Sequence, residues 1–283
     1  MKQKEIVDLS SFLDRVFTLN KPVGKTRCYR GQADANWPLK PSVMRGLRPD
    51  AENSILSELL LEAPAEFSSD RSMFDKLVRA QHYGLPTRLL DVSLNPLVGL
   101  YFSCAEREQW GEEGTVQVFD FSSTRVKTAD SDTVSLICNL ARLSDAERQA
   151  IDDKLGENRK WSAAKKTVFR SMAPMKRLNQ FVRMEKPYFL DIAEPRDLLR
   201  YFFVHPSKSN RRVIAQSGAF VAAGLLQYRS PDKSKGFEIV NIKIPASSKE
   251  LLLDQLDTLN INSRTMFPEV DSTAKYIRQK WVN

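Results

Sequence analysis

The 283-residue sequence predicts an α+β fold in which a mixed, mainly antiparallel sheet in the later part of the chain packs against a helical middle. Apolar residues recur at helical spacing over 51–67 and 72–83, and Ser144 with Glu147 forms a capping box for a further helix. Four stretches rich in β-branched and aromatic residues follow after residue 184. Because the helices cluster before these stretches, an alternating parallel-sheet fold is disfavoured.

The elements are expected in the following order. A short helix near residues 10–17 precedes a strand at 26–31, and three prolines within 34–49 indicate an ordered loop. Ser93 is expected to cap an almost wholly apolar helix with Pro96 in its first turn. Further strands are expected at 114–121, 185–192, 201–206, 213–224 and 236–245, with a helix capped by Ser247 and Glu250 and a last helix from about Glu269.

A polar stretch, QHYGLPTRLLDVS at residues 81–93, joins two apolar segments that are both expected to be helices. Its glycine and proline predict a turn. At this shielded joint Arg88 and Asp91 can form an ion pair, and His82 can be held neutral. Such side chains either build a functional site or satisfy helix ends, and the pattern leaves both interpretations open.

Two bulk features exclude classes of protein. No apolar stretch has the length of a signal-peptide core or a membrane span, so a cytoplasmic protein without a membrane partner is expected. The cysteines Cys28, Cys104 and Cys138 lack CxxC spacing and nearby histidine pairs. They are therefore expected to be buried thiols, and no metal site is predicted.

The net charge of +8 is concentrated in one block. The segment from Lys154 to Lys186 contains ten lysines and arginines but only two glutamates, and it lies within a predicted helical insertion over 144–186. A block of this kind binds a polyanion or a membrane surface, or forms a solvated helical face. If it binds nucleic acid, the residues expected to contact phosphates are Lys165, Lys166, Arg170, Lys176 and Arg177.

The tripeptide Tyr29–Arg30–Gly31 ends the first expected strand. A guanidinium at this place can grip a phosphate or carboxylate with two parallel hydrogen bonds, and Gly31 allows a ligand to approach the backbone. Alternatively, Arg30 pairs with a buried carboxylate of its own chain. The sequence contains no P-loop, GxGxxG, HExxH or GxSxG motif. Two histidines leave few options for a catalytic triad.

Several motifs in a fixed order resemble the FRG-domain family, which is named for a phenylalanine, here Tyr29, an arginine and a glycine. The longest is AQHYGLPTRLLDVS, which begins at Ala80. The resemblance implies a single FRG-type domain over 1–283, with the basic block as an insertion, in a bacterial protein. The other matching residues are Pro41–Ser42, Arg45, Glu66–Phe67, Asn95–Pro96–Leu97, Leu100–Tyr101–Phe102, Arg212, Gln216, Gly218, Phe220, Phe267–Pro268 and Asp271.

Arg30–Gly31 is also similar, more faintly, to the first motif of arginine–serine–glutamate ADP-ribosyltransferases. That resemblance implies NAD as cofactor, with the arginine on its phosphates and the next residue at the nicotinamide. A Ser-Thr-Ser strand and a late glutamate are not evident, so Thr87 or Ser93 and Gln216 take their places. The implied cofactor-binding residues are Tyr29, Arg30, Gly31, Thr87 and Ser93, and the implied catalytic residues are His82, Arg88, Asp91 and Gln216.

Three functions are compatible with these patterns. The first is an NAD-binding ADP-ribosyltransferase-like enzyme or NAD glycohydrolase, such as a toxin or defence effector, that acts on a protein or nucleic-acid acceptor. The second is a defence protein that binds or cleaves nucleic acid through the basic block. The third is a non-catalytic sensor module. Replacing a structural residue should lower the melting temperature, whereas replacing a ligand-binding residue often leaves it unchanged or raises it. The melting temperatures of variants therefore separate the third function from the others.

Overall fold

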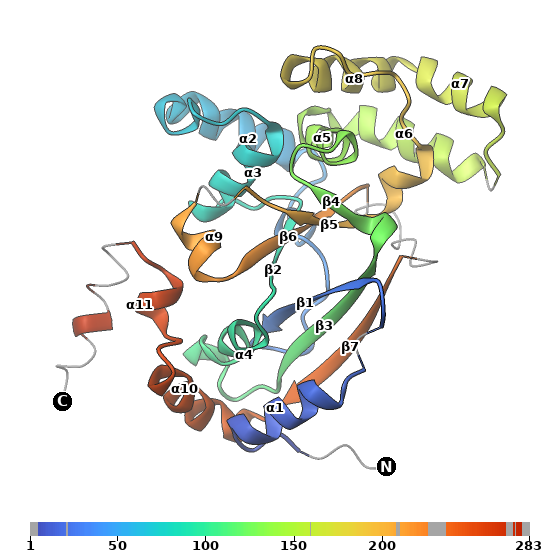
Figure 1. Cartoon of the computed structure of the whole chain (residues 1–283). Coiled ribbons are helices and arrows are strands. Elements are labelled where there is room, and N and C mark those ends of the chain that lie inside the picture. Colours follow the sequence, from blue (N-terminus) through green and yellow to red (C-terminus); the bar gives the residue numbers. More distant parts are fainter. Residues whose placement is uncertain are drawn as a thin grey trace.

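The computed structural model of the chain describes residues 5–20, 22–158, 160–207, 210–225, 236–269, 274 and 276–278. In this part of the chain, helices surround a seven-stranded sheet of order β4-β5-β6-β2-β1-β3-β7 (Figure 1). The strands are β1 (Lys25–Gln32), β2 (Leu89–Ser93), β3 (Gly114–Ser122), β4 (Val126–Thr128), β5 (Tyr201–His205), β6 (Gly218–Ala223) and β7 (Phe237–Ile244).

The sheet is mixed and mainly antiparallel, which confirms the predicted α+β class. Among the described strands β4 and β5 pair in parallel, and the other neighbouring pairs are antiparallel. The sheet is not confined to the later part of the chain, because β1, β2 and β3 come from its first half and lie next to one another in the sheet. The strand β2 was hard to foresee, since its five residues follow directly on a helix and a turn.

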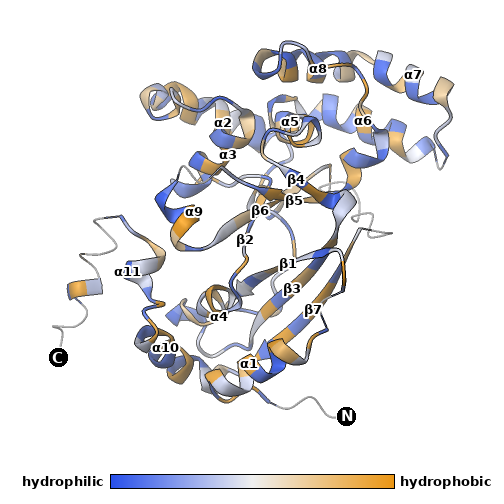
Figure 2. Cartoon of the chain, viewed as in Figure 1, coloured by the Kyte–Doolittle hydropathy of each residue, from blue (hydrophilic) through white to orange (hydrophobic). Residues whose placement is uncertain are grey.

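The sheet curls, so that its two halves share an apolar core. Phe121 of β3 packs against Phe203 of β5 with ring centroids 5.9 Å apart, although three strands separate them in the sheet. Cys28, Leu90 and Val221 belong to the same buried cluster. The halves β4-β5-β6-β2 and β1-β3-β7 meet between β1 and β2, where one residue pair, Tyr29 with Ser93, forms the ladder. The strands β5 and β6 are mostly hydrophobic (Figure 2), as burial on both faces requires.

Helices cover the outer faces of the two halves. On the β5–β6 side α3 (Met73–His82) and α5 (Asp132–Asn139) form one cluster, to which α2 (Ala51–Glu62) adds Leu56. On the other side α1 (Leu9–Thr18), α4 (Pro96–Cys104) and α10 (Lys249–Thr258) pack on β1, β3 and β7. Two short helices, α9 (Arg211–Ala215) and α11 (Ser263–Met266), lie at the side of the sheet (Figure 1).

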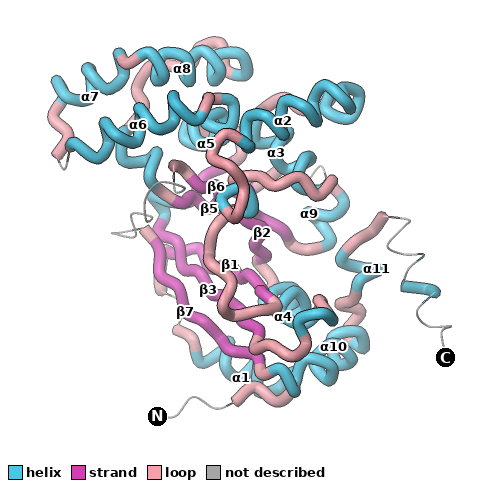
Figure 3. The backbone as a smooth tube through the Cα atoms, turned by 180° about the vertical axis from the view of Figure 1, so that it is seen from behind, coloured by secondary structure: helices cyan, strands magenta, loops and turns pink. Residues whose placement is uncertain are grey.

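The segment 144–186, which includes the basic block, is mostly helical. It contains α6 (Asp145–Glu157), which starts with the predicted Ser144–Glu147 capping box, α7 (Ala163–Ser171) and α8 (Ala173–Glu185). These helices share a buried cluster with α5 that includes Phe169 and Leu136, with Trp161 and Phe181 packed against it. The aromatic residues interleaved with the basic ones therefore form the core side of the block. Seen from behind, the block lies at the end of the molecule opposite α1 and α10 (Figure 3).

Several expected boundaries are wrong. Residues 185–192 form no strand, because Tyr188 and Leu190 point outward and their backbone pairs with no neighbouring strand. The 213–224 stretch begins as α9, and its strand starts only at Gly218. Leu89–Ser93 is a strand, so the stretch at 81–93 is not a joint between two helices. The last helix, expected from about Glu269, falls mostly outside the described residues.

Two expected helix caps are displaced by a residue or two. The side chain of Asn95, and not that of Ser93, caps α4 by accepting a hydrogen bond from the backbone N–H of Leu97 at 2.9 Å. Ser93 accepts instead from the N–H of Asn95. The N-cap of α10 is Ser248, whose side chain makes no capping bond, so the expected box of Ser247 with Glu250 does not form.

A contact between two glycines brings α4 onto β1. A Cβ atom on Gly31 would lie 2.0 Å from the carbonyl oxygen of Gly99 in α4, and one on Gly99 would lie 3.1 Å from the Cβ of Tyr29. No side chain fits at Gly31 without moving the helix. The glycine of the Tyr-Arg-Gly motif is therefore required by helix–strand packing.

We expect Gly31→Ala to lower the free energy of unfolding by about 1–3 kcal/mol, because the added methyl group meets backbone atoms that cannot rotate away. Urea denaturation measures this change. Gly111→Ala is the matched control, since a Cβ there meets nothing within 4 Å. Equal urea midpoints for the two variants would contradict the proposed close contact.

Candidate functional site

A pocket of about 250 Å³ opens where β1 separates from β2. Extending the ladder from Tyr29 and Ser93 would place Gly31 opposite Asp91, but the two strands part before that point. Residues from α4 and α9, and from the loop after β1, complete the walls. Six of the predicted site residues line this pocket, namely Tyr29, Arg30, Gly31, Asp91, Ser93 and Gln216.

Arg30 lines the pocket without a carboxylate partner among the described residues. Its Nη1 donates to the backbone carbonyl of Asp91 at 2.7 Å, and its buried Nε has no hydrogen-bond partner. Burial lowers the pKa of Arg30, although the charge of Asp91 acts in the opposite direction. The side chain nevertheless stays a cation, because arginine does not lose its proton in proteins. Of the two sequence interpretations, pairing with a buried carboxylate is therefore not the one observed.

Two further arginines reach the same pocket. Arg45 donates its Nε to the carbonyl of Lys40 at 2.7 Å, and burial lowers its pKa. The guanidinium of Arg212 lies over the ring of Phe267, 4.6 Å from its centroid. No ion pair is found for either side chain within the described residues. The pocket thus gathers three cations around a space that is partly closed from solvent.

The polar residues from β2 and α9 are fixed by their own hydrogen bonds. The carboxylate of Asp91 accepts from the side chain of Gln81 at 2.6 Å. The hydroxyl of Ser93 donates to the backbone carbonyl of Gln216 at 2.7 Å, and the Gln216 side chain donates to the carbonyl of Met266 at 3.0 Å. These bonds hold β2, the end of α9 and α11 together around the pocket.

Arg88 and Thr87, two other predicted site residues, lie in the protein interior and not at this pocket. Arg88 does not pair with Asp91; it pairs with Glu52, donating from Nε at 2.8 Å. Glu52 also accepts from Arg148 of α6 at 2.8 Å, and both arginines are fully buried. The buried Thr87 hydroxyl donates to Gln81. Arg88 therefore connects β2 to α2 and α6.

His82, the remaining predicted catalytic residue, ends α3 and is half-buried. Its Nδ1 lies 2.9 Å from the side-chain nitrogen of Asn210. Burial lowers the pKa of His82, and the positive charge of Arg212 adds to the effect. A neutral imidazole that accepts from the Asn210 amide fits both observations. His82 lines neither this pocket nor the larger one described next.

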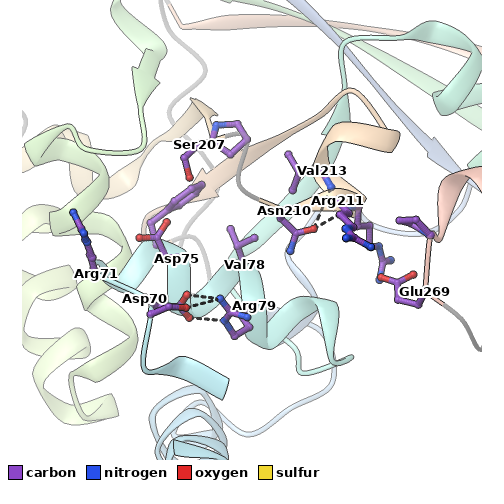
Figure 4. Close-up of a pocket in the computed structure, with 15 residues that line it drawn as sticks. Asp70, Arg71, Asp75, Val78, Arg79, Ser207, Asn210, Arg211, Val213 and Glu269 are labelled. Carbon is purple, nitrogen blue, oxygen red and sulfur yellow. Dashed lines mark hydrogen bonds and ion pairs between the residues drawn. The ribbon is translucent and has the colours of Figure 1, made fainter. Parts of the chain in front are cut away.

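A second pocket, of about 820 Å³, lies between α3 and α9 (Figure 4). Arg79 and Asp70 line part of it and form an ion pair at 2.7 Å. Arg212 borders both pockets. None of the predicted site residues lines the larger pocket, which makes the smaller one the candidate site.

The five predicted nucleic-acid contacts lie on α7 and α8. Three of them are engaged within the chain: Lys166 pairs with Glu194 at 2.6 Å, Arg177 with Glu147 at 3.4 Å, and Arg170 donates to the carbonyl of Ala193 at 3.0 Å. The other two, Lys165 and Lys176, are exposed. The block is thus partly a self-paired helical surface.

Some pocket residues did not stand out in the sequence. Gln32 lies two positions after Arg30 on the same strand, so strand alternation could have pointed to it. Trp37 and Glu106 come from loops, and no local pattern marks them. Their approach to Arg30 depends on how the loop after β1 and the end of α4 fold back.

These features define an α+β protein with a small, cationic and partly aromatic pocket at the split of a curled sheet. Residues 25–111 match the family model of the FRG domain, which confirms the resemblance predicted from the motifs. The matched region runs from β1 beyond α4 and excludes the basic helices. Comparison with curated proteins gave no match, and neither did comparison with solved structures.

No helix among the described residues combines the length and apolar character needed to cross a membrane. The described residues also hold no group of three or more histidine, cysteine, aspartate or glutamate side chains placed to bind a metal ion.

We expect Glu52→Gln to destabilise the protein by about 3–5 kcal/mol, because two buried guanidiniums would lose the carboxylate that they share. Chemical denaturation measures the loss. Asp50→Asn, at the same end of α2, is the control: its pair with Arg48 is exposed, so the change should stay below about 1 kcal/mol. A small effect at Glu52 would show that this cluster does not hold α6 against α2.

Proposed function

We propose that the pocket binds NAD and that the protein is an ADP-ribosyltransferase-like enzyme or an NAD glycohydrolase. The observation that carries this proposal is the state of Arg30, a cation at the pocket with no carboxylate partner among the described residues and with an unpartnered Nε. A cation whose buried Nε lacks an acceptor is costly unless an anionic ligand completes its hydrogen bonds. A phosphate oxygen supplies both the charge and the acceptor.

The neighbouring residues support a nucleotide over a simple anion. Arg45 and Arg212 can share the charge of a diphosphate with Arg30. Trp37 also lines the pocket, and an indole can stack on a planar heterocycle. A volume of about 250 Å³ is below the usual range for a drug-sized ligand. The pocket is therefore expected to enclose one end of NAD, with the other end reaching toward Arg212 and the larger pocket.

The chemistry would take place at the ribose carbon that carries nicotinamide. The bond from this carbon to the nicotinamide nitrogen breaks, and its electron pair leaves with neutral nicotinamide. Water or an acceptor nucleophile then forms the new bond and loses a proton. A carboxylate near this carbon would stabilise its developing positive charge, and the lining carboxylates are Asp91 and Glu106. Gln216 is suited to a hydrogen bond with a ribose hydroxyl.

The predicted positions contribute differently to this proposal. Tyr29 and Gly31 form the strand that carries Arg30, and Ser93 fixes Gln216 through its backbone. We assign Thr87, Arg88 and His82 to positioning β2 and α9, since they do not line the pocket. A role as a toxin or defence effector would suit an enzyme that consumes NAD or modifies an acceptor.

We expect Arg30→Gln to weaken NAD binding about 10- to 100-fold, because a charge-assisted contact with phosphate is worth about 1.5–3 kcal/mol. Isothermal titration calorimetry measures the affinity, and chromatography measures release of nicotinamide. The melting temperature should stay unchanged or rise, since a poorly compensated cation is removed.

The control for Arg30 is Arg48→Gln, which removes an exposed guanidinium outside the pocket. It should leave NAD affinity unchanged. Absence of NAD binding by the unmodified protein would refute the proposal. A lower melting temperature of Arg30→Gln with unchanged affinity would instead favour the non-catalytic sensor.

A nucleic acid is the acceptor, or the alternative ligand, that the basic helices favour. The supporting observation is that Lys165 and Lys176 are exposed, next to further basic residues of α7 and α8. Exposed lysines on adjacent helices can contact successive phosphates.

We expect the double variant Lys165→Ala, Lys176→Ala to weaken binding of a short DNA duplex. The number of counterions released on binding, given by the slope of log affinity against log salt concentration, should fall by up to about two. Fluorescence anisotropy over a salt series measures both quantities. Replacing Lys25 and Lys243 on the strands removes the same charge elsewhere and should have less effect. Equal effects of the two double variants would assign any binding to net charge alone.

A further inference from the structure

Unpartnered polar atoms gather on one face of β1 and β3. Four buried side-chain atoms there have no hydrogen-bond partner in the described part of the chain: Nε of Arg30, Nε2 and Oε1 of Gln32, and Oε1 of Gln117. Gln32 is 2% exposed and Gln117 is 7% exposed. A buried amide with both polar atoms unpaired is rare in native proteins and calls for an explanation, such as a ligand or ordered water.

The sheet register places these three residues side by side. Arg30 lies directly opposite Gln117 in the antiparallel ladder, and Gln32 lies opposite Thr115. Directly opposed residues point to the same face, and side chains two apart on one strand do so as well. Arg30, Gln32 and Gln117 therefore form a triangle on the face that α4 does not cover, since α4 packs against Tyr29 and Gly31 on the other face.

Of these three residues, Gln32 is the one that can discriminate between ligands. It lines the pocket together with Arg30 and Trp37. Its side chain offers one acceptor and two donors, and none of them bonds to a residue that the structure describes. The complement of such an amide is a planar edge that carries a donor and an acceptor next to each other.

We propose that Gln32 is a specificity-determining residue that reads a planar amide or amidine-like edge of the ligand, with Gln117 supporting Arg30 and Gln32 from β3. This inference rests on the proposed NAD site and deepens it. NAD carries such an edge twice, in the nicotinamide carboxamide and in the amino edge of adenine. The shared chemistry is the adjacent donor and acceptor, and Trp37 offers a stacking surface for the ring that bears them.

The test compares three ligands on two proteins. The ligands are NAD, its deamido analogue with a carboxylate on the pyridine ring, and its hypoxanthine analogue, which lacks the adenine amino group. The proteins are the unmodified chain and Gln32→Met, which keeps the length of the side chain without its polar atoms. We expect Gln32→Met to bind NAD at least 10-fold more weakly and to lose the discrimination against one analogue. That analogue identifies the edge that Gln32 reads.

Stability provides a second readout. Replacing an unsatisfied buried amide with an apolar side chain of similar shape should keep or raise the melting temperature of the free protein. Gln149→Met on α6 is the control, because Gln149 is exposed and bonds Asp153 at 2.9 Å. It should alter neither NAD affinity nor discrimination.

The outcomes separate this inference from the proposed function. Unchanged affinity and discrimination in Gln32→Met, with Arg30→Gln defective, would overturn only the role of Gln32 and assign its amide to ordered water. Absence of NAD binding by the unmodified protein would overturn both. A loss of affinity together with a lowered melting temperature would also count against a specificity role, because it indicates a structural residue.

Discussion

The close approach of α4 to β1 is the constraint on which the site depends. Gly31 and Gly99 bring the helix backbone into contact with the strand. The same helix starts directly after β2, at a cap made by Asn95. The chain must therefore leave β2, turn and return across β1 within a few residues. Such a path is compatible with a single ladder pair between β1 and β2, and the space beyond that pair is the pocket.

The two faces of β1 make opposite contributions to the stability of the protein. On the face toward α4, Tyr29 is buried in an apolar cluster and Gly31 permits close packing. On the other face, Arg30 and Gln32 have buried polar atoms that find no partner among the described residues. Unmet hydrogen bonds of this kind lower stability, and they persist where a ligand completes them. One eight-residue strand thus serves both as a packing element and as a wall of the proposed site.

Local patterns predicted much of the fold. Capping chemistry located α6, strand composition located β1, β3, β5 and β7, and the class of the sheet was correct. The strand β2 was missed because LLDVS carries no alternation that distinguishes it from the apolar helix that follows. Residues 185–192 have strand composition, but their side chains instead meet solvent and the helical cluster around Phe189.

The candidate site was predicted only where the chain itself brings residues together. Tyr29, Arg30 and Gly31 are consecutive, and Asp91 and Ser93 share one strand next to them. Arg88 could not be assigned from sequence, because its partner Glu52 is 36 residues away and nothing local marks the pair. Trp37 and Glu106 reach the pocket through loops, whose course depends on tertiary packing.

The cluster of Glu52, Arg88 and Arg148 has a consequence for how this sequence can diverge. Glu52 and Arg88 lie within residues 25–111, which match the FRG domain, whereas Arg148 lies on the basic helices outside them. Loss of one charged partner at these buried positions leaves another charge uncompensated, which is strongly destabilising. The matched region and the basic helices are therefore coupled energetically at this point, and we expect homologues to change these residues together.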